Sequence, residues 1–243
     1  MKAHLIAAGK FHDIDFARLE LLKLLAELPE VRTSVASDYG DLASLAAADL
    51  LITYTCDLLP DAVQTEAVAA FLARGGRWLA LHGTNATLRF GSDGVVDTPD
   101  AAPVFTGLLG TRFAGHPPIA PFKVSVTRGD HVMTAGLRDF RVEDELYLTH
   151  RTAAIDVLLH TSFTGSCPEF RDSEWDEPQV PVLYERRVGD GAILYLTLGH
   201  CRGHYDLRPL ADFWPHPQRC SWNYPVFAEL LRRGIRWGLP QTG

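Results

Sequence analysis

The sequence has no long hydrophobic run. The closest approach, Leu42 to Ile52, is interrupted by Asp49, well short of the roughly 18 apolar residues that a membrane span needs. The apolar stretch at the N-terminus is also too short for a signal peptide, since His12, Asp13 and Asp15 follow it at once. We therefore expect no membrane partner and a cytoplasmic location.

Cysteine is scarce and scattered. The four cysteines, Cys56, Cys167, Cys201 and Cys220, form no C-x-x-C pair. Free thiols are the expectation, and the spacing argues against a zinc site built from cysteines.

Basic charge is in the minority, with 23 Lys and Arg against 30 Asp and Glu, for a net charge of -7. A nucleic-acid partner is not expected, because such partners usually require a basic patch. The common phosphate-binding motifs, G-x-G-x-x-G and G-x-x-x-x-G-K-[ST], are absent, as are G-x-S-x-G and G-x-C-x-G. Dinucleotide-binding, P-loop and serine-hydrolase functions therefore lack their residues.

Strand and helix patterns alternate through the first third of the chain. Buried strands are predicted over 4–8, 31–36, 49–54 and 77–81, with helices over 15–28 and 59–74. This order favours parallel pairing with right-handed crossovers. The remainder predicts a short helix over 104–109, strands over 110–113, 122–126 and 156–160, and loops over 90–103 and 169–179. A hairpin over 181–188 and 192–198 and a closing helix over 225–233 follow. No linker divides the chain, so one domain over 1–243 is expected.

His82 follows the strand 77–81 directly and precedes Gly83. Ligands of open α/β sheets bind beyond the carboxyl ends of the strands, so this imidazole stands where a functional group is expected. His200 also follows a predicted strand, and His116 lies between a glycine and two prolines. Glu145 ends an acidic run. If these four converge, they form either an acid-base set or a metal site.

Structural roles compete with these assignments. An imidazole at a strand end often only satisfies backbone groups, and Glu143 and Asp144 also suit a solvated turn. The remaining histidines, at positions 4, 12, 131, 150, 160, 204 and 216, are predicted to hold no ligand. The tryptophans also suit packing. The aromatic residues Tyr205, Trp214, Trp222 and Tyr224 nevertheless gather within one long segment, which favours a ligand with apolar ring faces, such as a sugar.

Taken in order, several segments resemble the ThuA-like family, named from trehalose utilisation. They are Gly75-Gly76 with Leu81-His82-Gly83-Thr84, Gly110 to His116-Pro117, Asp144-Glu145-Leu146-Tyr147, Pro181 to His200 with Gly189-Asp190-Gly191, and Leu231 to Trp237. The resemblance implies a flavodoxin-like three-layer α/β sandwich, with a mostly parallel central sheet and helices on both faces. It is the fold of class I glutamine amidotransferases, but His82 stands where those enzymes have cysteine, so glutamine hydrolysis is not expected.

The resemblance also implies a role in sugar catabolism, including that of oxidised (keto) disaccharides. From the histidines and Glu145, our hypothesis is isomerisation or hydrolysis of a disaccharide or keto-sugar derivative by acid-base chemistry. The expected catalytic residues are His82, His116, Glu145 and His200. The expected substrate-binding residues are Gly83, Thr84, Asn85, Tyr147, Arg202, His204, Tyr205 and Trp214. A divalent metal, if used, would be held by His82, His116 and His200. A homo-oligomer is an option, since dimers are common among such folds.

Two alternatives stay open at this stage. One is a non-catalytic sugar-binding or assembly domain on the same scaffold, because a fold alone does not decide function. The other is an amidase or protease that uses Cys56, which follows the strand 49–54.

The segment 201–223 is longer than a minimal member of the family needs and suggests a subgroup with its own substrate.

Overall fold

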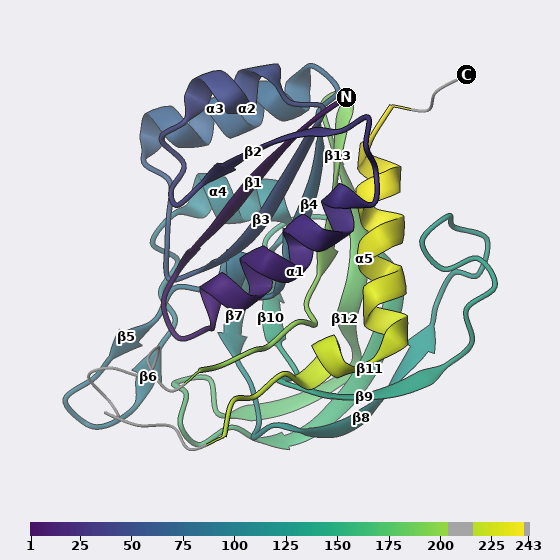
Figure 1. Cartoon of the computed structure of the whole chain (residues 1–243). Helices are drawn as coiled ribbons and strands as arrows, with labels where there is room; N and C mark the ends of the chain where they lie inside the picture. The colour runs from purple at the N-terminus through teal and green to yellow at the C-terminus, as the bar shows by residue number, and fades with distance from the viewer. Residues whose placement is uncertain (204–215, 241–243) are drawn as a thin grey trace.

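A nine-stranded sheet with helices on both faces forms the centre of the molecule (Figure 1). The computed structural model describes residues 1–203 and 216–240. In one half of the sheet, neighbouring strands are parallel. In sheet order these strands are β2 (Arg32–Ala36), β1 (Lys2–Gly9), β3 (Leu50–Cys56), β4 (Arg77–Leu81) and β13 (Gly191–Leu196). The flavodoxin-like α/β class is therefore confirmed.

Antiparallel strands extend the sheet beyond β13. They follow in the order β12 (Glu174–Val188), β11 (Asp156–Ser166), β8 (Ala120–Val126) and β9 (Phe140–Asp144). The predicted hairpin is confirmed as β12 and β13, joined through Gly189, whose φ is +60°. Two short ribbons lie outside the sheet: β7 (Thr111–Gly115) with β10 (Leu148–Arg151), and β5 (Arg89–Phe90) with β6 (Val96–Asp97).

Helices α1 (Ile14–Ala26) and α5 (Pro225–Gly238) lie side by side on one face of the sheet (Figure 1). Helices α2 (Leu42–Ala47), α3 (Ala62–Ala73) and α4 (Pro103–Leu109) cover the other. Each face has its own apolar core, with Leu21 and Ile235 in the first and Phe71 and Phe105 in the second. Strands β1, β3, β4 and β13 between them are buried on both sides, which is why their sequences are largely apolar, whereas the edge strand β2 is partly exposed.

Several predicted boundaries are wrong. Residues 174–179, predicted as loop, belong to β12, and β11 continues to Ser166 rather than ending at His160. These strand ends pair with each other as a two-stranded ribbon beyond the core, so their residues alternate between exposed and half-buried and lack an apolar signature. Helix α2 and strands β9 and β10 were not predicted, and α5 runs to Gly238 rather than Arg233.

Candidate active site

Three histidines follow the carboxyl ends of parallel strands. His82 follows β4 and opens the short 3-10 turn η1 (His82–Asn85), His200 lies just beyond β13, and His12 lies just beyond β1. Strands β4 and β13 are paired, and β3 alone separates β1 from β4. The three imidazoles therefore reach one edge of the sheet. This edge lies at the topological switch point beside β1, where the connections to the neighbouring strands run in opposite directions along the sheet.

Unusual backbone conformations orient the rings of His82 and His200. His82 has a φ of +44°, unusual for a residue with a side chain, and such strain often accompanies function. Gly199 precedes His200 with a φ of +121°. A Cβ at Gly199 would lie 3.1 Å from the Phe227 ring and 3.7 Å from the His82 Cβ. The positive φ and the tight contact with the Phe227 ring thus favour glycine at this position.

Glu145 reaches the same place from β9, and the buried Asp144 beside it ties the two segments together. The Asp144 carboxylate accepts backbone hydrogen bonds from Gly199 at 2.8 Å, from His200 at 3.0 Å and from Glu145 at 2.8 Å. The Ser221 hydroxyl also donates to it. Asp144 is thus a positioning residue that fixes the turn carrying His200 against the strand end carrying Glu145.

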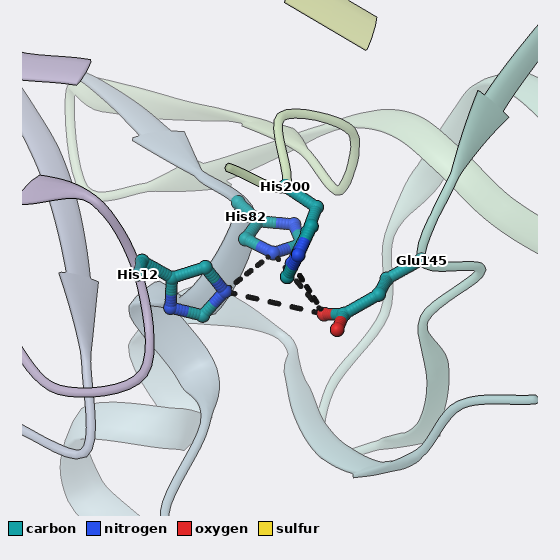
Figure 2. Close-up of side chains that lie close together, drawn as sticks. All are labelled: His12, His82, Glu145 and His200. Atoms are coloured by element: carbon teal, nitrogen blue, oxygen red, sulfur yellow. Dashed lines mark hydrogen bonds and ion pairs between the residues drawn. The ribbon is translucent and has the colours of Figure 1, made fainter. Parts of the chain in front are cut away.

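The four side chains converge closely (Figure 2). Glu145 Oε2 lies 3.0 Å from His200 Nδ1, 3.5 Å from His82 Nε2 and 4.0 Å from His12 Nε2. The Nε2 atoms of His12 and His82 are 2.9 Å apart. All four side chains are at most 3% exposed. One donor atom from each lies within 4.8 Å of the others, so these four residues are able to hold a metal ion.

The cluster shifts the pKa values of its members. Burial lowers the pKa of His12 well below its usual value, and His82 and His200 lower it further. Burial alone would also lower the pKa of His200, but the nearby Glu145 carboxylate raises it above the usual value. The pKa of Glu145 is well below its usual range, because His116, His200 and His82 outweigh the effect of burial. Glu145 is therefore a carboxylate at neutral pH.

His116 and Arg202 approach the other oxygen of the same carboxylate. His116 Nε2 and Arg202 Nη2 each lie 3.6 Å from Glu145 Oε1. His116 Nδ1 is 2.9 Å from the carbonyl oxygen of Pro117, and Arg202 Nε donates to the carbonyl oxygen of Phe11. The side chains of His116 and Arg202 are 21% and 19% exposed, so they form the accessible side of the cluster.

A cavity of about 190 Å³ opens on this accessible side. Its polar lining consists of His12, His116, Glu145, Glu169 and Arg202, and its aromatic lining of Phe11, Phe90, Phe113, Tyr147 and Phe170. Aromatic faces around a few convergent polar groups are typical of sites for small ligands, sugar rings among them.

The remaining predicted site residues fall into three groups. Tyr147 lines the cavity, with its ring 4.3 Å from that of His82. Gly83, Thr84 and Asn85 are buried in η1, where Thr84 donates to the Leu81 carbonyl and Asn85 Nδ2 donates to Thr111. None of these three lines the cavity, so the structure assigns them to supporting the His82 turn. His204, Tyr205 and Trp214 lie outside the described residues.

His12 is the residue that sequence reasoning missed. It was predicted to hold no ligand, yet its ring faces His82 at the centre of the cluster, while His116 lies outside that set of donors. The donor atoms that lie close together are those of His12, His82, Glu145 and His200, whereas the predicted metal set was His82, His116 and His200. The available signal was its place after the first strand of a parallel sheet, where binding loops gather.

The family model for trehalose utilisation, ThuA, matches residues 9–212. The chain belongs to the ThuA family. Its place in sugar metabolism follows from this membership. No curated protein matches the chain.

Solved structures similar to this ThuA-family chain share its fold at low sequence identity. Putative ThuA-like proteins from Bacteroides uniformis and Parabacteroides merdae are each 17% identical, with TM-scores of 0.66 and 0.64. The first match covers 98% of this chain and 91% of the other, and the second covers 100% and 92%. A β-galactosidase from Bacillus circulans sp. alkalophilus is also similar, with 14% identity and a TM-score of 0.54, over 97% of this chain and 30% of that enzyme.

Among the described residues, no helix has the length and apolar character needed to cross a membrane.

Proposed function

We propose that the chain is an enzyme of sugar catabolism that acts on a keto-sugar or keto-disaccharide by removing the proton next to its carbonyl. The observation that carries this proposal is the arrangement around Glu145 Oε1. A mostly buried imidazole and a guanidinium both face it, at 3.6 Å each, from the wall of an aromatic-lined cavity. Membership of a family named for trehalose utilisation supports the substrate class.

His116 is the proposed base. Its Nδ1 faces the carbonyl oxygen of Pro117, which can only accept, so in the neutral ring the hydrogen is on Nδ1. The lone pair of Nε2 then faces the cavity and Glu145. Glu145 is ionised and stabilises the imidazolium that forms when His116 takes the proton.

Arg202 is proposed to stabilise the charge that develops on the substrate. Loss of the proton moves the electron pair of the C–H bond toward the carbonyl, whose oxygen becomes an oxyanion. A guanidinium fixed by its hydrogen bond to Phe11 is suited to that position. An isomeric ketone forms when His116 returns the proton to the former carbonyl carbon and the hydroxyl on the deprotonated carbon passes its own proton to the oxyanion. Departure of a glycosidic oxygen from the β carbon, protonated by His116, cleaves a keto-glycoside instead.

Deuterium exchange tests the proposal without knowledge of the final product. Trehalose oxidised to a ketone on one ring is incubated with the protein in D₂O, and loss of the signal from the proton next to the carbonyl is followed by NMR. We expect wild-type protein to exchange this proton, and His116→Asn to exchange it about 10²- to 10⁴-fold more slowly.

His150→Asn is the matched control, because this histidine is exposed and paired with Asp172 outside the cavity. It should exchange at the wild-type rate. Sugar binding without exchange above the enzyme-free rate would overturn the proposal in favour of a binding domain. Exchange that is undiminished in His116→Asn would remove His116 from the base role.

A further inference from the structure

The outward nitrogens of the three clustered imidazoles all face oxygen acceptors. His82 Nδ1 lies 2.8 Å from the carbonyl oxygen of Thr197, and His12 Nδ1 lies 3.1 Å from that of Lys10. His200 Nε2 lies 3.0 Å from Gln218 Oε1. Carbonyl and amide oxygens only accept hydrogen bonds, so each outward nitrogen carries the hydrogen. This is the arrangement by which proteins orient histidine ligands of metals.

In the neutral rings, each inward nitrogen consequently carries a lone pair and no hydrogen. His12 Nε2 and His82 Nε2 point at each other across 2.9 Å, and His200 Nδ1 lies 3.0 Å from an oxygen of the Glu145 carboxylate. His200 Nδ1 is buried and, within the part of the chain that the structure describes, makes no hydrogen bond of acceptable geometry, even to this close oxygen. Four electron-pair donors thus face one buried point, where their mutual repulsion requires positive charge.

We propose that this point is a binding site for one divalent first-row transition metal ion, held by His12 Nε2, His82 Nε2, His200 Nδ1 and Glu145. A metal at about 2.0–2.2 Å from each ligand places neighbouring ligand atoms about 3 to 4 Å apart. Four of the six separations run from 2.9 to 4.0 Å, and all six lie within 4.8 Å. Without a metal, relieving this repulsion would take two protons, one between His12 and His82 and one between His200 and Glu145. One divalent ion supplies the same positive charge.

The ligand set selects the class of metal. Three imidazoles and one carboxylate favour zinc, manganese, iron, cobalt or nickel over magnesium and calcium, which prefer oxygen ligands. His12 and Glu145 also line the cavity, so a metal there has one side toward a bound ligand. In its catalytic consequence this inference rests on the proposed function, since a metal at this place polarises a carbonyl oxygen in the cavity.

Metal content tests the site independently of any reaction. Untagged full-length protein is equilibrated with Zn²⁺ or Co²⁺, desalted and analysed by mass spectrometry of the metal, and the Co²⁺ form is examined by visible absorption. We expect about one metal per chain and d–d bands of nitrogen-rich, low-symmetry coordination. Less than about a tenth of an equivalent, or a spectrum of hexaaqua Co²⁺, would overturn the inference.

Variants then assign the ligands. His12→Ala and Glu145→Gln should each lower metal affinity by at least about tenfold, since each removes one of four ligands. His116→Asn should keep the metal, because His116 faces the other side of Glu145. Retention of wild-type affinity by His12→Ala would contradict the assignment, and the wild-type cobalt spectrum remains decisive if a variant fails to fold.

The two proposals fail separately. Metal binding without deuterium exchange would leave the metal site standing and remove the proposed reaction. Exchange by protein that binds no metal would do the reverse.

Discussion

At the residue scale, the site depends on a few oxygen atoms that fix the orientation of buried rings. The Thr197 carbonyl holds His82 at 2.8 Å, and the Asp144 carboxylate holds the backbone of His200 at 3.0 Å. Burial raises the pKa of Asp144. Its hydrogen bonds from Gly199, His200, Glu145 and Ser221 keep it in place. The orientation of the clustered histidines is thus fixed by groups that do not line the cavity.

Cys56 gives a residue-scale prediction against the amidase alternative. It lines the cavity but is 2% exposed, and burial raises the pKa of its thiol, with Asp57 and Glu145 raising it further. A thiol must ionise to react, so native protein should be alkylated at Cys56 by iodoacetamide at pH 7.5 far more slowly than urea-unfolded protein. Peptide mass spectrometry measures both rates. Rapid native labelling of Cys56, together with loss of deuterium exchange, would restore the cysteine mechanism.

At the element scale, the loop after β1 depends on a close approach between two strand ends. Gly9 has a φ of +112°, and a Cβ there would lie 2.0 Å from the Cys56 carbonyl oxygen. That oxygen also accepts a hydrogen bond from Lys10 at 2.9 Å. The turn that presents His12 is therefore built on glycine at position 9.

Gly9→Ala should lower the free energy of unfolding by at least about 3 kcal/mol, because left-handed strain and a backbone collision add together. Gly94→Ala is the matched control. Its φ is +80°, but nothing lies within 4 Å of the added Cβ, so strain alone should cost about 1–2 kcal/mol. Urea unfolding followed by fluorescence measures both. Equal losses in the two variants would refute the collision.

Periodicity predicted those elements whose residues face a core, and missed those that do not. Strand 77–81 is confirmed in full, and the strands predicted over 31–36 and 49–54 shift by a residue or two. The outer halves of β11 and β12 were not predicted as strands, because their residues pair with each other and are not buried in the core. For the site, sequence order located His82 and His200 at strand ends, and Glu145 was expected near them only as the end of an acidic run. The convergence with His12 could not be read locally, since it depends on which strands become neighbours.

At the scale of the whole molecule, the first and last helices are joined by an ion pair. Arg232 in α5 donates from Nε at 2.8 Å and from Nη2 at 2.7 Å to the two carboxylate oxygens of Glu27, the C-cap of α1. Hydrogen bonds from Arg232 lower the pKa of Glu27. The pair therefore stabilises the fold above the usual glutamate pKa of about 4.3, and this contribution is lost as the pH falls through the lower folded-state value.

Glu27→Gln should show a small decrease in melting temperature at pH 7 and low salt, shrinking toward zero below about pH 4. Scanning calorimetry across pH values measures the difference from wild type. Glu30→Gln is the control, because that exposed carboxylate forms no ion pair among the described residues. A difference that is independent of pH would contradict an origin in the Glu27–Arg232 pair.

The order of strands in the sheet has a consequence for synthesis on the ribosome. Strand β13 occupies the place beside β4, although more than a hundred residues separate them in the chain. A nascent chain that has released β1 to β4 therefore presents an open strand edge next to His82 and His12. Most of the remaining polypeptide must be synthesised before His200 can take its place beside His82 and His12. The four donors can therefore come together only after most of the chain has been synthesised.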